Sequence, residues 1–101
     1  MFSLLKNLFG TGTDYKTLLA NGAVIVDVRT PGEFRGGHIK GSINIPVDSI
    51  SQQINDLKKK GKTVITCCAS GMRSSSAASI LKGAGIEAYN GGSWMSLQQK
   101  I

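Results

Sequence analysis

The sequence predicts an α/β domain built around a parallel β-sheet, and three observations support this prediction. Short apolar, β-branched runs alternate along the 101 residues with segments of helical periodicity. Residues 23–28 are an almost continuous apolar run, which is typical of a strand buried on both faces of a parallel sheet. Helical segments separate successive strands, so the connections are crossovers, which join parallel strands.

Residues 1–12 are expected to form a lead-in segment, and residues 13–101 a single domain. The lead-in is apolar, but Lys6 interrupts it and no small-residue cleavage site follows. We therefore expect neither a secretory signal nor a membrane span, and a cytoplasmic location. The lead-in is interpreted as an amphipathic helix, with peripheral membrane contact as the alternative. Its apolar side chains are expected to pack on the domain: Phe2, Leu5 and Phe9.

Capping and turn residues predict two short helices on either side of the first strand. Thr13 is expected to cap a helix that extends to residue 19 and ends at the turn-prone pair Asn21-Gly22. The string Thr30-Pro31-Gly32-Glu33 carries a threonine cap, a proline at the first helical position and a glutamate that completes a capping box. We expect the second helix over residues 33–36.

Periodicity, together with the intervening glycines and prolines, predicts the remaining elements. Residues 42–45 alternate in polarity like a strand, which Pro46 stops. Ser49 and Gln52 are expected to form a capping box for a helix that Gly61 ends. The later elements are expected in this order: a strand over 63–66, a helix over 74–81 ended by Gly83, a strand over 86–89, a turn over 90–92 and a helix over 93–100.

The stretch Cys67-Cys68-Ala69-Ser70-Gly71-Met72-Arg73-Ser74 joins a predicted strand to a predicted helix. Ligands bind to open α/β sheets at the carboxyl ends of the strands. The free N–H groups at the start of the following helix hold anions, and their positive field favours a thiolate over a thiol. Arg73 adds a permanent positive charge. The stretch therefore predicts a nucleophilic cysteine in an anion-binding loop.

The net charge of +6 raises the question of nucleic-acid binding, which the sequence does not support. The densest basic run, Lys58 to Lys60 with Lys62, ends a predicted helix, where cations complement the helix dipole. No aromatic residues interleave with this run, and no nucleic-acid motif occurs. We expect the positive field to attract a small anionic substrate instead.

Two adjacent cysteines and one histidine predict neither a disulfide framework nor a metal site, and no cofactor is expected. His38 could act as a proton donor, but a thiolate held by dipoles does not need one, so we expect a structural hydrogen bond. Arg29 and Glu33 are spaced to pair with each other. Asp27, at the end of a strand, could line the site or support it, and we expect support.

Three segments of the sequence occur in the order and at the spacing of one known family. They are VDVRTPGEF at residues 26–34, GHIKGSINIP at 37–46 and CASGMRS at 68–74. These segments resemble single-domain rhodaneses, sulfurtransferases that carry a sulfane sulfur as a cysteine persulfide. The resemblance covers roughly residues 13–97. It implies a small rhodanese-like domain with a central parallel sheet flanked by helices on both faces.

Carried over residue by residue, the resemblance implies that Cys68 is the nucleophile. The family's cradle of backbone N–H groups falls on the residues that follow: Ala69, Ser70, Gly71, Met72 and Arg73. Candidate accessory residues are Ser74, Asp27 and Arg29. The chain departs from the family pattern in two places. Ala69 and Ser70 are small and neutral where the family often has a basic or bulky residue. Trp94 follows Gly91-Gly92 more closely than the family's usual tryptophan.

The resemblance implies transfer of a sulfane sulfur from thiosulfate or a similar donor to a thiol or cyanide, through a Cys68 persulfide. One alternative is a sulfur-relay or docking module that acts with a protein donor or acceptor. Another is a phosphatase or arsenate reductase, because Cys67 to Arg73 has the Cys-x5-Arg spacing of those enzymes. Side chains alternate at a strand end, so one cysteine should face the loop. The Cys-x4-Arg spacing of sulfurtransferases favours Cys68, with Cys67 filling the core.

Overall fold

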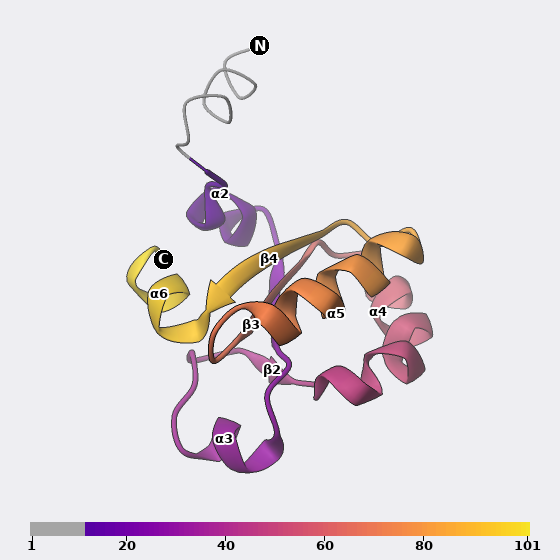
Figure 1. Cartoon of the computed structure of the whole chain (residues 1–101). Helices are drawn as coiled ribbons and strands as arrows, with labels where there is room; N and C mark the ends of the chain where they lie inside the picture. The colour runs from indigo at the N-terminus through magenta and orange to yellow at the C-terminus, as the bar shows by residue number, and fades with distance from the viewer. Residues whose placement is uncertain (1–11) are drawn as a thin grey trace.

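A parallel sheet of four strands forms the centre of the computed structural model, which describes residues 12–101 (Figure 1). Its strands are β1 (Val24–Asp27), β2 (Ile43–Asn44), β3 (Val64–Cys68) and β4 (Ala88–Ser93). Their spatial order is β2-β1-β3-β4, and each neighbouring pair is parallel. The predicted α/β fold with a parallel sheet is therefore confirmed. The expected packing of Phe2, Leu5 and Phe9 lies outside the described residues and stays a prediction.

Helices cover both faces of this sheet. They are α2 (Tyr15–Ala20), α3 (Pro31–Arg35), the 3-10 helix η1 (Val47–Gln53), α4 (Ile54–Lys60), α5 (Met72–Gly83) and α6 (Trp94–Gln99). On one face, Val26 and Val64 pack with residues of η1, α4 and α5. On the other, Ile25 and Ile65 pack with Leu97 and with α2. Neighbouring strand residues thus enter opposite core layers, as the pleat requires. Within residues 12–101, no helix combines the length and apolar character needed to cross a bilayer.

The cap of the first helix lies one residue later than predicted. Asp14, and not Thr13, caps α2, because its Oδ1 accepts the Thr17 N–H at 3.1 Å. The capping box predicted between Thr30 and Glu33 is present at the start of α3. The capping box therefore identified α3, although the helix begins two residues before the predicted range of 33–36.

The predicted capping box of Ser49 and Gln52 is wrong. The chain enters the 3-10 helix η1 directly after Pro46, and the Ser49 N–H donates to the Pro46 carbonyl at 2.8 Å. Ser49 is therefore inside a helical turn that already uses its backbone, and η1 has no side-chain cap. Gly61 ends α4 as predicted, in a left-handed conformation with φ of 63°.

The predicted turn over residues 90–92 is also wrong, because β4 continues through it to Ser93. Asn90 pairs with Thr66 and Ser93 pairs with Cys68, so β4 carries one extra residue as a β-bulge. Gly91 lies at a close approach between the two strands: a Cβ there would be 2.8 Å from the Thr66 carbonyl oxygen. The two adjacent glycines of this sequence thus mark close packing and a bulge.

Candidate active site

Strand β3 brings the predicted cysteine to the carboxyl edge of the sheet. The strand includes Cys68, two residues beyond its predicted end. Gly71 then adopts φ of 99°, a left-handed conformation that favours glycine, and α5 begins at Met72. This tight connection turns the backbone N–H groups of the loop back toward Cys68.

Backbone and side-chain groups of the loop converge on Cys68 Sγ. The Gly71 N–H lies 3.0 Å from the sulfur and the Ser74 N–H 3.4 Å. Ser74 Oγ is also 3.4 Å away. Burial acts to raise the pKa of the Cys68 thiol, but hydrogen bonds from Ser74 and from the N–H groups of Gly71 and Ser70 outweigh it, so the pKa is lowered. The surroundings therefore favour the thiolate.

Cys67 lies on the opposite face of the sheet. It packs in the core layer that contains Ile25, Ile65 and Leu97, and has no exposed surface. Burial raises the pKa of its thiol to about 12, so it stays protonated at neutral pH. The structure therefore brings Cys68, and not Cys67, to the N–H groups of the loop.

Arg73 forms a two-pronged ion pair with Glu33 of α3. Its Nη1 lies 2.8 Å from Oε1 and its Nη2 3.0 Å from Oε2. The predicted pairing of the Glu33 carboxylate with Arg29 is therefore wrong. The hydrogen bonds from Arg73, followed by the one from the Thr30 N–H, lower the pKa of Glu33 to about 2. The loop arginine thus ties the start of α5 to α3.

Arg29 forms a buried ion pair with Asp27, at 2.7 Å between Nη2 and Oδ2. The same Nη2 donates to the Gly37 carbonyl at 2.7 Å, and the guanidinium lies 4.8 Å from the ring centroid of Trp94. These contacts connect β1 to the loop after α3 and to the start of α6. They fit the expected supporting role of Asp27, and an accessory role of either residue in chemistry stays a prediction.

Two asparagines that sequence reasoning missed connect the loops at this edge. Asn44 Nδ2 donates to the carbonyls of Asp27 and Arg29 at 3.0 and 2.9 Å. Asn90 Oδ1 accepts the hydroxyl hydrogen of Ser74 at 2.6 Å. Each asparagine lies at least 15 positions from the partners named here, so no local sequence signal could have identified these contacts.

His38 makes the structural hydrogen bond that the sequence predicted. Its Nδ1 lies 2.7 Å from the Phe34 carbonyl oxygen, and its ring stacks on that of Phe34 with centroids 3.7 Å apart. Among residues 12–101, no group of three or more histidine, cysteine or acidic side chains is placed to hold a metal ion.

Two large apolar side chains are exposed at the carboxyl edge of the sheet. Met72 at the start of α5 is 78% exposed, and Met95 at the start of α6 is 62% exposed. The loop residues Ala69 and Ser70 are exposed as well. The exposed side chains of the loop and of the starts of α5 and α6 thus include small and apolar ones, beside the partly exposed ion pair of Arg73 and Glu33.

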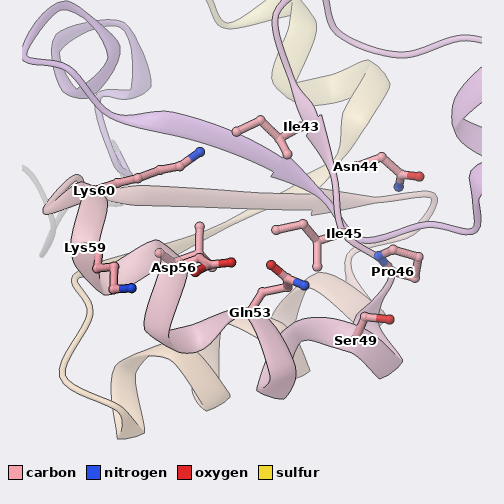
Figure 2. A pocket seen from close by; sticks show the side chains of 10 residues that line it. Ile43, Asn44, Ile45, Pro46, Ser49, Gln53, Asp56, Lys59 and Lys60 are labelled. Atoms are coloured by element: carbon pink, nitrogen blue, oxygen red, sulfur yellow. The ribbon is translucent and has the colours of Figure 1, made fainter.

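A separate cavity of about 640 Å³ lies beside the edge strand β2. Figure 2 shows Ile43 and Ile45 on one side of it, and Gln53, Asp56 and Lys60 on the helical side. No residue from Cys67 to Ser74 lines it. The cysteine loop and this cavity are distinct features of the surface.

Comparison with known proteins agrees with this geometry. The family model described as "Rhodanese-like domain" matches residues 11–96. The sequence is 42% identical to the protein YqhL of Bacillus subtilis over 69 residues, which is 67% of this chain and 54% of that protein. It is 37% identical to the thiosulfate sulfurtransferase GlpE of Pseudomonas entomophila, with coverage of 68% of this chain and 62% of GlpE.

A solved structure has a similar fold. The structure described as "rhodanese with anions from E. coli" superimposes with a TM-score of 0.68 at 30% identity, with coverage of 74% of this chain and 91% of that one. The chain spans less than two thirds of the two curated relatives it matches, YqhL and GlpE. The family model covers most of the chain, and the chain belongs to the rhodanese-like domain family.

Proposed function

We propose that the protein is a sulfurtransferase that moves a sulfane sulfur from thiosulfate or a similar donor to a thiol or cyanide, through a persulfide on Cys68. The observation that carries this proposal is the set of N–H groups around Cys68 Sγ, from Gly71 at 3.0 Å and Ser74 at 3.4 Å. Such donors stabilise negative charge on sulfur without a dedicated base. Membership of the rhodanese-like family supports the same chemistry.

In the proposed reaction, the Cys68 thiolate attacks the outer sulfur of thiosulfate. A bond forms between Sγ and that sulfur, the sulfur–sulfur bond of thiosulfate breaks, and sulfite leaves with the electron pair. The N–H groups of Gly71 and Ser74 then hold the terminal part of the persulfide. A second thiophile attacks the terminal sulfur and releases the Cys68 thiolate, as in thiol–disulfide exchange.

Arg73 braces the loop in this proposal. An arginine in such a loop can brace the loop or pair with the oxygens of an anionic donor. Both Nη atoms of Arg73 donate to Glu33, so a two-pronged pair with a sulfonate would require Arg73 to leave that partner. Cys68 has no exposed surface, so the loop has to move for a donor to reach the sulfur. A small donor fits this requirement best.

The deciding experiment is intact mass spectrometry after brief incubation with thiosulfate. We expect wild type to gain one sulfur atom, about 32 Da, and to lose it on addition of cyanide, because an activated thiolate forms a persulfide. Cys68→Ser should show no gain. Cys67→Ser is the matched control and should keep most of it, because Cys67 lies in the opposite core layer.

Two other outcomes would change the assigned nucleophile or the assigned class of reaction. A sulfur gain that requires Cys67 would reverse the roles of the two cysteines. Turnover of an aryl phosphate or arsenate through Cys67, without any sulfur gain, would place the protein with enzymes that act on oxyanions. The placement of Cys67 and its raised pKa do not support that alternative.

A sulfur relay between proteins is the second candidate function, and the exposed methionines favour it. Met72 and Met95 present apolar surface beside the loop, where a partner protein could dock. In this case a protein persulfide should compete with thiosulfate for Cys68. The measurement is the rate of sulfur loading from each donor, alone and mixed. A rate from thiosulfate that exceeds the rate from every protein donor tried would count against a relay.

A further inference from the structure

The side chain of Asn90, on β4, makes three hydrogen bonds: with Ser74, Gly71 and Gly92. Its Oδ1 accepts the Ser74 hydroxyl at 2.6 Å and the Gly92 N–H at 2.9 Å. Its Nδ2 donates to the Gly71 carbonyl at 3.3 Å. These partners fix the orientation of the Asn90 amide. The Gly92 N–H needs the acceptor Oδ1, and the Gly71 carbonyl needs the donor Nδ2.

Ser74 lies between Asn90 and the proposed nucleophile. Its hydroxyl has a single hydrogen, which is donated to Asn90 Oδ1. The same oxygen, 3.4 Å from Cys68 Sγ, can then only accept from the cysteine, which requires a protonated thiol. If Cys68 ionises, its proton leaves and Sγ becomes an acceptor. The Ser74 hydrogen must then turn away from Asn90 to reach the sulfur.

We propose that Asn90 is a positioning residue that competes with Cys68 for the hydroxyl hydrogen of Ser74 and so stabilises the thiol relative to the thiolate. This inference deepens the proposed function, on which its role in sulfur transfer rests. When Cys68 is a thiol, two hydrogen bonds form: one from Cys68 Sγ to Ser74 Oγ, and one from Ser74 Oγ to Asn90 Oδ1. When it is a thiolate, the bond to Asn90 is lost, although Oδ1 keeps its bond from the Gly92 N–H. Asn90 therefore limits how readily the nucleophile ionises.

Ser74 has no exposed surface, whereas Asn90 itself is exposed, so a test variant must still cover Ser74 to keep water from replacing Oδ1 as the acceptor. Leucine has a similar size to asparagine but neither accepts nor donates, so Asn90→Leu removes the acceptor while filling the space. Charged and titratable groups on the surrounding elements remain in this variant: Asp27, Arg29, Glu33, Cys67, Arg73, Glu87 and Tyr89.

The test is a pH titration of the thiolate absorbance of Cys68 in wild type, Asn90→Leu, Ser74→Ala and the double variant. Cys67 does not interfere, since the pKa of its thiol is about 12. We expect Asn90→Leu to lower the midpoint by about half a unit to one unit, the effect of one neutral hydrogen bond. Ser74→Ala should raise it, because the thiolate loses a donor. In the Ser74→Ala background, Asn90→Leu should lower the midpoint no further.

A purely structural role for Asn90 predicts a different sign. Loss of its bond to Gly71 would loosen the loop, weaken the Gly71 N–H bond to sulfur and raise the midpoint. An unchanged or raised midpoint in Asn90→Leu, or an equal fall with and without the Ser74 hydroxyl, would overturn the proposal. If Asn90→Leu does not fold, Asn90→Ile makes the same comparison, because isoleucine also fills the space without an acceptor and is favoured in strands. The titration needs no sulfur donor, so its failure is distinguishable from a failure of sulfur transfer.

Discussion

Cys67 and Cys68 show how strongly the direction of a side chain decides its chemistry. They are adjacent in β3, and the pleat of the strand sends them to opposite core layers. Burial among apolar side chains raises the pKa of Cys67 to about 12. Cys68 is equally covered, but hydrogen bonds from the loop lower the pKa of its thiol. Reactivity thus depends on donors around the sulfur more than on exposure.

Glu33 provides a prediction about pH and stability. Its pKa falls from 4.5 to about 2 in the folded protein, mainly through the hydrogen bonds from Arg73. A lowered folded-state pKa stabilises the fold above pH 4.5, and this contribution is lost as the pH falls toward 2. Glu33→Gln should therefore be less stable than wild type at neutral pH, and the difference should vanish near pH 2.

Urea denaturation of both proteins across this pH range measures the effect. Glutamine can still complete the capping box with Thr30, so the variant tests the ion pair and not the helix cap. A stability difference that is independent of pH would contradict the assignment.

Strand β4 shows how one element positions another. Asn90, which pairs with Thr66 just before the bulge, contacts Ser74, and β4 continues through the bulge to Ser93 at the start of α6. The bulge depends on close contact between β4 and β3 at Gly91. Helix α5 also depends on a glycine, but for its backbone conformation: Gly71 is left-handed, which allows the chain to turn from β3 into the helix.

Gly91→Ala should therefore destabilise the protein. Its Cβ would lie 2.8 Å from the Thr66 carbonyl oxygen and 2.9 Å from Leu97 Cδ2, closer than packed atoms approach. We expect a loss of about 1–3 kcal/mol, as for other overpacked cores. Gly83→Ala, at the end of α5, is the control: no atom lies within 4 Å of its Cβ, and it should gain up to about 1 kcal/mol. Denaturant titration measures both, and equal stability of the two variants would contradict the packing argument.

The whole molecule gathers the candidate site from segments that are distant in sequence. Because all strands are parallel, their carboxyl ends and the following loops meet at one edge of the sheet. Arg73 and Glu33 are 40 positions apart, and Ser74 and Asn90 are 16 apart, yet both pairs form hydrogen bonds there. The cavity beside β2 lies apart from this edge, and no residue of the cysteine loop lines it.

The sequence by itself determined the fold class, most elements and the position of the cysteine loop. These rest on local signals: hydrophobic periodicity, the Thr30–Glu33 capping box and the glycine that ends α4. Only the tertiary structure decided that Glu33 pairs with Arg73, that Gly91 marks close packing and that Asn90 contacts Ser74. Such contacts depend on the register and order of the strands, which bring distant residues together. They produce no local or periodic pattern in the sequence from which they could be predicted.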